Sequence, residues 1–217
     1  DALFRYLAWA EDDTFLTGFT LGLLPPTTMK AQGPVKITCN PALMFAKVPA
    51  FARPLYIPHG PARDEPDYDK KLGMIAEQYL DHDVRTVTGT TCWFSLLFDK
   101  VLEEANRRGR RARHVRDVWP NLRFLIGGGV AAEPYLPVIR ERIGRSDVAL
   151  VDTYNATEGG LYAVTDAFGE AGARARGMLM IPDRGVFFEF VPVEELDRPN
   201  PTRVPLWGVE RDRNYAI

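Results

Sequence analysis

The sequence predicts an α/β fold in which a mainly parallel sheet is flanked by helices. Three short apolar runs, at 84–88, 122–126 and 148–151, have the length and composition of buried strands. Segments with helical spacing of apolar residues separate these runs, at 93–107 and about 133–143. Strands that alternate with helices along a chain are typical of a parallel sheet with helices packed on it.

The first third of the chain is expected to supply further pieces of this fold. Apolar residues recur at helical spacing over 1–10, and residues 14–24 are rich in Thr, Phe and Leu, which predicts a strand. Many prolines over 41–66 predict a long ordered loop or short pieces of structure. Asp67 can cap a helix that runs to about Leu80. The expected inner face of that helix consists of Leu72, Ile75, Ala76 and Tyr79.

A further strand is expected at 186–191, where three phenylalanines cluster, and the last four residues, 214–217, read like a strand that is just beginning. The chain also begins at Asp1 rather than at a methionine. We therefore expect both ends to be cuts through a longer protein. Residues 1–217 would then be one partial domain.

The bulk composition limits the classes of function. The chain has 217 residues, of which 46% are hydrophobic, and a formal net charge of -2. That balance gives no reason to expect nucleic acid or an anionic membrane as a partner. No run of about 18 apolar residues and no signal peptide is visible. Cys39 and Cys92 cannot form a disulfide framework, so we expect a reduced, cytoplasmic setting.

Two glycine-rich segments follow predicted strands, where an open α/β sheet binds its ligands. Gly127, Gly128 and Gly129 follow one strand directly, and glycines let a ligand approach the backbone closely. The segment is not a Walker A loop, because the Gly-Lys-Ser/Thr ending is absent. By itself the triple glycine fits a ligand crevice and a tight strand-to-helix turn equally well.

The second segment, 154–160, combines three kinds of chemistry within five residues. Tyr154 offers a flat face for a purine, Thr157 a hydroxyl for a phosphate oxygen, and Glu158 a carboxylate for a hard cation such as Mg²⁺. This set fits a nucleotide-plus-metal site. An ordinary loop with Glu158 in solvent is the alternative interpretation, and the chemistry alone leaves both open.

The order and spacing of several motifs add a resemblance to a known family. The segment Tyr154-Asn155-Ala156-Thr157-Glu158-Gly159 resembles the Tyr-x-x-Ser/Thr-Glu turn of adenylate-forming enzymes. Its surroundings resemble the auxin-responsive acyl acid–amido synthetases, in their bacterial form. The other matching pieces are 118–122, the triple glycine, Pro134-Tyr135 and 185–192. The resemblance covers most of the chain from about Asp83 onward, and the first eighty residues match only loosely.

The resemblance implies a role for each matching position. Tyr154, with Asn155 and Ala156, would flank the adenine, Thr157 would contact the α-phosphate region, and Glu158 would bind Mg²⁺. The triple glycine would line the nucleotide crevice. By family position, Thr91 and Trp93 would lie at the edge of the acyl pocket. Asn155 and Ala156 depart from the family, where many relatives have Ser-like or small residues, which leaves the detailed phosphate contacts in doubt.

The implied activity is that of a ligase. A small carboxylic acid would attack the α-phosphorus of ATP, and an amino acid would then take the acyl group from the adenylate. The first step needs alignment and charge neutralisation rather than a base, because the nucleophile is already ionised. Two family elements are not found in this sequence, the Ser/Thr/Gly-rich phosphate loop and the ribose aspartate with its C-terminal lobe. The isolated chain is therefore expected to be inactive.

Two rival interpretations remain. The chain could belong to an acyl-CoA ligase of the same superfamily, or it could be a nucleotide-binding fragment without catalysis. The histidines do not decide between them, because His59, His82 and His114 lack metal-ligand spacing and are expected to be structural or solvent-facing.

Overall fold

The computed structural model describes residues 13–156, 160–165, 177–182 and 185–217. The chain forms two compact units, Asp1–Leu179 and Met180–Ile217, and each is considered by itself. The helix expected over 1–10 lies outside the described residues. Within the described ranges, none of the helices combines the length and the apolar composition that crossing a membrane requires.

The larger unit is organised around a seven-stranded sheet whose strand order is β4-β1-β5-β6-β7-β8-β9. Neighbouring strands from β4 to β7 run parallel, whereas β8 is antiparallel to β7. The prediction of a mainly parallel sheet is thus confirmed. The strands are β1 (Phe19–Leu23), β4 (Tyr56–Ile57), β5 (Val84–Gly89), β6 (Phe124–Gly128), β7 (Ala149–Ala156), β8 (Gly160–Thr165) and β9 (Met178–Met180).

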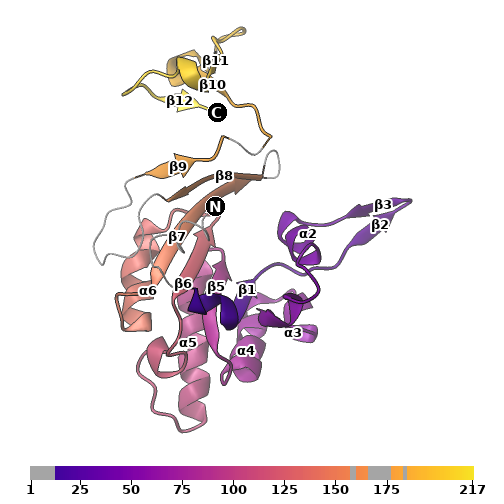
Figure 1. Cartoon of the computed structure of the whole chain (residues 1–217), viewed down its shortest axis with the longest axis vertical. Coiled ribbons are helices and arrows are strands. Elements are labelled where there is room, and N and C mark those ends of the chain that lie inside the picture. The colour runs from indigo at the N-terminus through magenta and orange to yellow at the C-terminus, as the bar shows by residue number, and fades with distance from the viewer. Residues whose placement is uncertain (1–12, 157–159, 166–176, 183–184) are drawn as a thin grey trace. The chain divides into compact units, whose positions relative to one another are not determined.

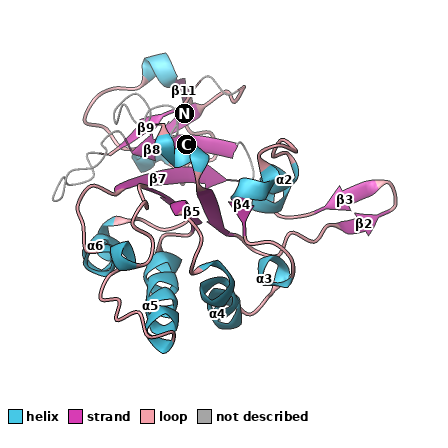
Figure 2. Cartoon of the chain, turned by 60° about the horizontal axis from the view of Figure 1, so that its bottom comes forward, coloured by secondary structure: helices cyan, strands magenta, loops and turns pink. Residues whose placement is uncertain are grey.

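Three helices lie side by side against one face of this sheet (Figure 2). They are α4 (Tyr68–Tyr79), α5 (Cys92–Arg107) and α6 (Leu136–Ile143). In sequence, α4 connects β4 to β5, α5 connects β5 to β6, and α6 connects β6 to β7, and these four strands follow one another in one direction across the sheet. Because crossovers between parallel strands are nearly always right-handed, such a succession places all its helices on the same face.

The helix after Asp67 forms as the sequence predicts. The Asp67 side chain accepts a hydrogen bond from the backbone N–H of Lys70, which caps the first turn of α4. All four residues of the expected inner face are buried. They join a core that also takes in the apolar stripe of α5 and the buried side chain of Trp119. The core therefore lies between the sheet and its helix layer.

The proline-rich segment turns out to be short pieces of structure rather than one loop. It holds α2 (Asn40–Ala46), a 3-10 helix (Arg53–Leu55), the edge strand β4 and α3 (Pro61–Asp64). The strand expected over 14–24 is shorter, because a 3-10 helix (Thr14–Thr17) precedes β1.

Further 3-10 helices lie at Val115–Asp117, Glu133–Tyr135, Val193–Glu195 and Leu206–Gly208.

A small hairpin, β2 (Lys30–Gln32) and β3 (Val35–Ile37), was not expected from the sequence and extends away from the large sheet (Figure 1). Gly33 at its turn has a φ of 61°, the positive value that the first central residue of a type II′ turn requires. All six strand residues are exposed. The alternation of apolar and polar residues that predicts a half-buried strand is therefore not required here.

The smaller unit corrects the strand expected at 186–191. The strand there is β10 (Glu189–Pro192), and it belongs to a separate antiparallel sheet with β11 (Val204–Pro205) and β12 (Tyr215–Ala216). Phe188 and Phe190 are buried, but Phe187 is 70% exposed. The cluster of phenylalanines therefore contains one residue that does not help to bury the strand.

Candidate functional site

The segments singled out in the sequence meet at the carboxyl edge of the large sheet. Because β6 and β7 run parallel, their ends lie at the same edge, where Gly127 pairs with Asp152 and Gly128 with Thr153. β7 continues beyond the end of β6 as far as Ala156. The structure thereby places the triple glycine beside the start of the Tyr154 segment.

The first residues of the Tyr154 segment, 154–156, form a strand rather than the turn expected after residue 151. Tyr154 pairs with Ala163 of β8, and Ala156 pairs with Gly160, so the two strands form a hairpin. β8 supplies the backbone partners that keep the chain extended beyond the buried apolar run. Residues 157–159 connect the two strands. Thr157 and Glu158, the expected phosphate and metal residues, lie in that connection, outside the described residues.

Packing against Thr91 explains the first glycine of the triple glycine. The Thr91 hydroxyl accepts a hydrogen bond from Gly128 N at 3.1 Å, and Thr91 N donates to Gly128 O at 3.3 Å. A Cβ atom on Gly127 would lie 2.2 Å from Thr91 Oγ1. Thr91 is itself fully buried. If Thr91 belongs to an acyl pocket, it acts there by fixing the backbone rather than by presenting its hydroxyl.

Thr153 closes the opposite side of the same glycines. Its hydroxyl donates to Gly127 O at 2.6 Å, and Asn155 Nδ2 donates to Thr153 Oγ1 at 3.5 Å. A Cβ atom on Gly128 would lie 2.7 Å from Thr153 Oγ1. Gly127 and Gly128 are both buried, whereas Gly129 is exposed and has a φ of 78°. Gly129 is therefore the member of the triple glycine whose backbone a ligand can approach.

Asp152 is a buried carboxyl at this edge that the sequence reasoning missed. Its Oδ2 atom accepts a hydrogen bond from Ala132 N at 3.1 Å and so ties down the loop after the triple glycine. Its backbone N–H donates to Thr165 Oγ1 of β8 at 3.2 Å. Burial raises the pKa of Asp152, and the backbone N–H groups of Ala132 and Thr153 oppose that rise. A polar residue directly after an apolar strand run was the available signal.

This raised pKa predicts a pH dependence of stability that Asp152→Asn should remove. The folded state holds the proton more tightly than the unfolded state, whose pKa is near 3.8. The contribution of Asp152 is thus full below that value and is lost as pH rises through the folded pKa. We expect the urea midpoint of the wild type to fall relative to that of Asp152→Asn as the pH rises above about 4. Parallel midpoint curves would show that Asp152 has an ordinary pKa.

The aromatic residue expected to stack on the adenine is accessible. Tyr154 is 52% exposed, and its ring centroid lies 5.7 Å from that of Tyr162, with the ring planes tilted by 51°. Asn155 beside it is exposed and Ala156 is half-buried. A large aromatic side chain that remains half-exposed on a strand has a face free for a ligand. Its role at the adenine stays a prediction.

Trp93, expected at the acyl pocket, lies at the start of α5. Its ring is half-buried and stacks on Tyr68 of α4, with centroids 4.3 Å apart and an angle of 26° between the planes. α5 begins two residues after Thr90, whose Cγ2 atom would lie 3.3 Å from a Cβ atom on Gly129. Trp93 therefore lies near the same edge of the sheet as the triple glycine, at the end of β5.

Neither metal ligands nor catalytic histidines gather elsewhere in the part of the chain that the structure describes. Within it, no group of three or more His, Cys, Asp or Glu side chains could hold a metal ion. His59 Nε2 lies 3.3 Å from the carbonyl of Pro54, and His82 packs edge-on against Phe19 and Tyr79. His114 N donates to Asp117 Oδ2 at 2.9 Å in a capping interaction.

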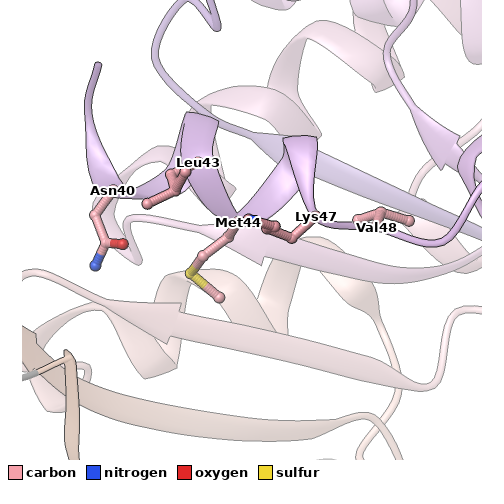
Figure 3. Close-up of a pocket in the computed structure, with 5 residues that line it drawn as sticks. All are labelled: Asn40, Leu43, Met44, Lys47 and Val48. Atoms are coloured by element: carbon pink, nitrogen blue, oxygen red, sulfur yellow. The ribbon is translucent and has the colours of Figure 1, made fainter. Parts of the chain in front are cut away.

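An apolar hollow of about 440 Å³ lies over α2 and the residues that follow it (Figure 3). Its lining residues are Asn40, Leu43, Met44, Lys47 and Val48. All of them come from one short stretch of chain, so no second element among the described residues closes the hollow. Ligand sites enclose most of a small molecule and present converging polar groups. The hollow over α2 has neither property, and the carboxyl edge is the better candidate.

Comparison with known proteins identifies the fold. No family model and no curated protein matches the chain. Among solved structures, AtGH3.15 acyl acid amido synthetase in complex with 2,4-DB matches 98% of this chain with a TM-score of 0.66 and 12% sequence identity. Apo MatB from Rhodopseudomonas palustris matches 93% of the chain with 15% identity, but its TM-score of 0.47 is too low to argue from.

The chain spans 44% of the matched amido synthetase structure and 32% of the MatB structure. At 12% identity the likeness establishes a shared fold and does not by itself transfer an activity. The chain thus has the α/β fold of a substantial part of an acyl acid amido synthetase.

Proposed function

We propose that this chain is the central part of the large N-terminal domain of an ATP-dependent acyl acid–amido synthetase. The observation that carries the proposal is the meeting of two motifs at one carboxyl edge, the triple glycine of β6 and the Tyr154 segment of β7. Ligands of open α/β sheets bind at this edge. The fold shared with an acyl acid amido synthetase over 98% of the chain supports the same proposal.

Each part of this edge has a task in the proposed site. Tyr154 presents its exposed face to the adenine, and Asn155 and Ala156 continue the strand beside it. Gly129 lets the nucleotide approach the backbone, while Thr91 and Thr153 hold the two buried glycines in place. Thr157 donates to the α-phosphate. Trp93 lies against the acyl group.

Glu158 is proposed to bind Mg²⁺ together with the nucleotide phosphates. A carboxylate is the kind of ligand that Mg²⁺ takes when phosphates supply most of the rest of its coordination. The pairing of Ala156 with Gly160 at the end of the hairpin, next to Glu158 in the sequence, supports this proposal. When bound, the ion would neutralise charge on the phosphates.

The proposed reaction consists of two substitution steps, and neither changes an oxidation state. An oxygen of the acyl carboxylate forms a bond to the α-phosphorus of ATP, and the bond to pyrophosphate breaks. The amine of an amino acid then attacks the acyl carbon of the adenylate, AMP leaves, and the amine loses a proton to solvent. The protein contributes alignment and charge stabilisation to both steps.

The first test measures acid-dependent pyrophosphate release by the full-length protein with ATP, Mg²⁺ and a panel of carboxylic acids. The second test adds either an amino acid or coenzyme A as the acyl acceptor and identifies the product. An amide product with an amino acid supports the proposal. A thioester with coenzyme A would instead identify an acyl-CoA ligase. Absence of pyrophosphate release with every acid would favour a nucleotide-binding protein without this catalysis.

Substitutions of Tyr154 test the stacking role. Stacking needs a ring but not its hydroxyl, so we expect Tyr154→Phe to keep most of the ATP affinity. Tyr154→Ala should lose about 1–3 kcal/mol, the contribution of one base–aromatic stack. Calorimetric titration of the full-length protein with ATP measures both. Equal losses in the two variants would mean that the hydroxyl, rather than the ring, is what matters.

A further inference from the structure

Lys71 is a buried cation that the proposed chemistry does not use. It lies in α4 with none of its surface exposed, and its ammonium donates to the carbonyl of Leu24 at 2.7 Å. The ion pairs of the other α4 and α5 lysines in the described ranges join Lys70 to Glu65 and Lys100 to Asp69. Lys71 takes part in none of the ion pairs formed among the described residues.

Stability does not explain a lysine at this position. Removing an ammonium from water costs several kcal/mol unless a counter-charge and hydrogen bonds compensate. Burial lowers the pKa of Lys71, and the carboxylates of Asp64 and Glu65 oppose this only at a distance. Glu65 is already paired with Lys70 at 2.7 Å. A methionine of similar length would fill the space without this cost, so Lys71 must serve some other purpose.

The first contact of Lys71 fixes the segment that leaves β1. Leu24 follows the last residue of that strand, and Leu23 pairs with Gly89 at the end of β5. Thr27 lies three residues after Leu24. Its backbone N–H and its hydroxyl donate hydrogen bonds to the carboxylate of Asp64, at 2.9 Å and 2.8 Å. Two long-range side-chain contacts therefore hold residues 24–27 at the carboxyl edge of the sheet.

The second contact of Lys71 leads to Trp93. The ammonium lies 5.6 Å from the centroid of the Tyr68 ring, within the range of a cation–π interaction. The same ring also stacks on Trp93, with the ring centroids 4.3 Å apart. Lys71 thus touches both residue 24 and the aromatic residue that supports Trp93.

We propose that Lys71 is a positioning residue that sets the acyl side of the site by holding two of its walls, the 24–27 segment and the Tyr68–Trp93 stack. The inference rests on the proposed function. It assigns the discrimination among acyl acids to a residue that need not touch the acid. A shift of about 1 Å in a positioning element can cost as much as 100-fold in rate.

The test compares Lys71→Met with Lys70→Met in the full-length enzyme. Lys70 is the adjacent residue of the same helix, its side chain is 68% exposed, and it lies outside the proposed site. For Lys71→Met we expect the KM for the carboxylic acid to rise roughly tenfold or more. The KM for ATP should change by less than about twofold, and the melting temperature should stay equal or increase. Lys70→Met should leave all three unchanged.

An unchanged KM for the acid in Lys71→Met would overturn the inference. So would equal rises in both KM values together with a lower melting temperature, because that pattern describes general loosening. If Lys71→Met does not fold, Asp64→Ala decides, since it removes the acceptor of both Thr27 hydrogen bonds and should raise the KM for the acid alone. Failure of the proposed function is distinguishable from these outcomes, because the wild type would then release no pyrophosphate with any acid.

Discussion

Glu158→Gln in the full-length enzyme is expected to lower acid-dependent pyrophosphate release roughly 100-fold or more. The change removes a charge at nearly constant volume, so packing should not suffer. A carboxylate that binds Mg²⁺ contributes to the alignment and the charge balance of the triphosphate, and an amide replaces it poorly. Initial rates of pyrophosphate release, with the melting temperature measured in parallel, give the effect.

Glu141→Gln is the matched control for this prediction. Glu141 lies in α6, its side chain is 72% exposed, and it is at most in a weak surface ion pair with Arg142 at 3.6 Å. The same substitution there should leave the rate unchanged. Pyrophosphate release at a near wild-type rate in Glu158→Gln would remove Glu158 from the site. Restoration of much of the lost rate by raised Mg²⁺ would strengthen its assignment as a metal ligand.

The larger elements of the fold could be predicted because their signals are local. The capping residue Asp67 and apolar residues at helical spacing predict α4, and all residues of the predicted inner face are buried in the structure. β7 was predicted only as far as residue 151, because its apolar run ends there. Tyr154 to Ala156 remain extended through pairing with β8, a partner that no local pattern reveals.

The candidate site was predictable in place but not in detail. A strand followed by glycines located the triple glycine at the carboxyl edge, which is a local argument. The reason for Gly127 lies in Thr91, 36 positions earlier in the sequence, and the reason for Gly128 lies partly in Thr153. Such contacts depend on strand register and on the start of α5, and neither can be read from the composition of the segment.

Gly127→Ala is expected to destabilise the protein by about 1–3 kcal/mol, the usual range for overpacking a well-packed interior. The new methyl group would lie 2.2 Å from Thr91 Oγ1, so the threonine must move. That movement breaks the hydrogen bond in which the hydroxyl accepts from Gly128 N at 3.1 Å. Denaturant unfolding of the full-length protein measures the loss. Gly73→Ala is the control, since nothing lies within 4 Å of its added Cβ and its helical site favours alanine.

A double-mutant cycle separates this local clash from a general intolerance of β6. Thr91→Ala alone should also destabilise, because it leaves the buried Gly128 N–H without its acceptor. In the double variant the methyl group of Gly127→Ala occupies space that the threonine has vacated. We therefore expect the double variant to be more stable than the sum of the single effects, by roughly 0.5–3 kcal/mol. Strict additivity would mean that the two positions do not touch, and Thr91 would no longer explain the glycine.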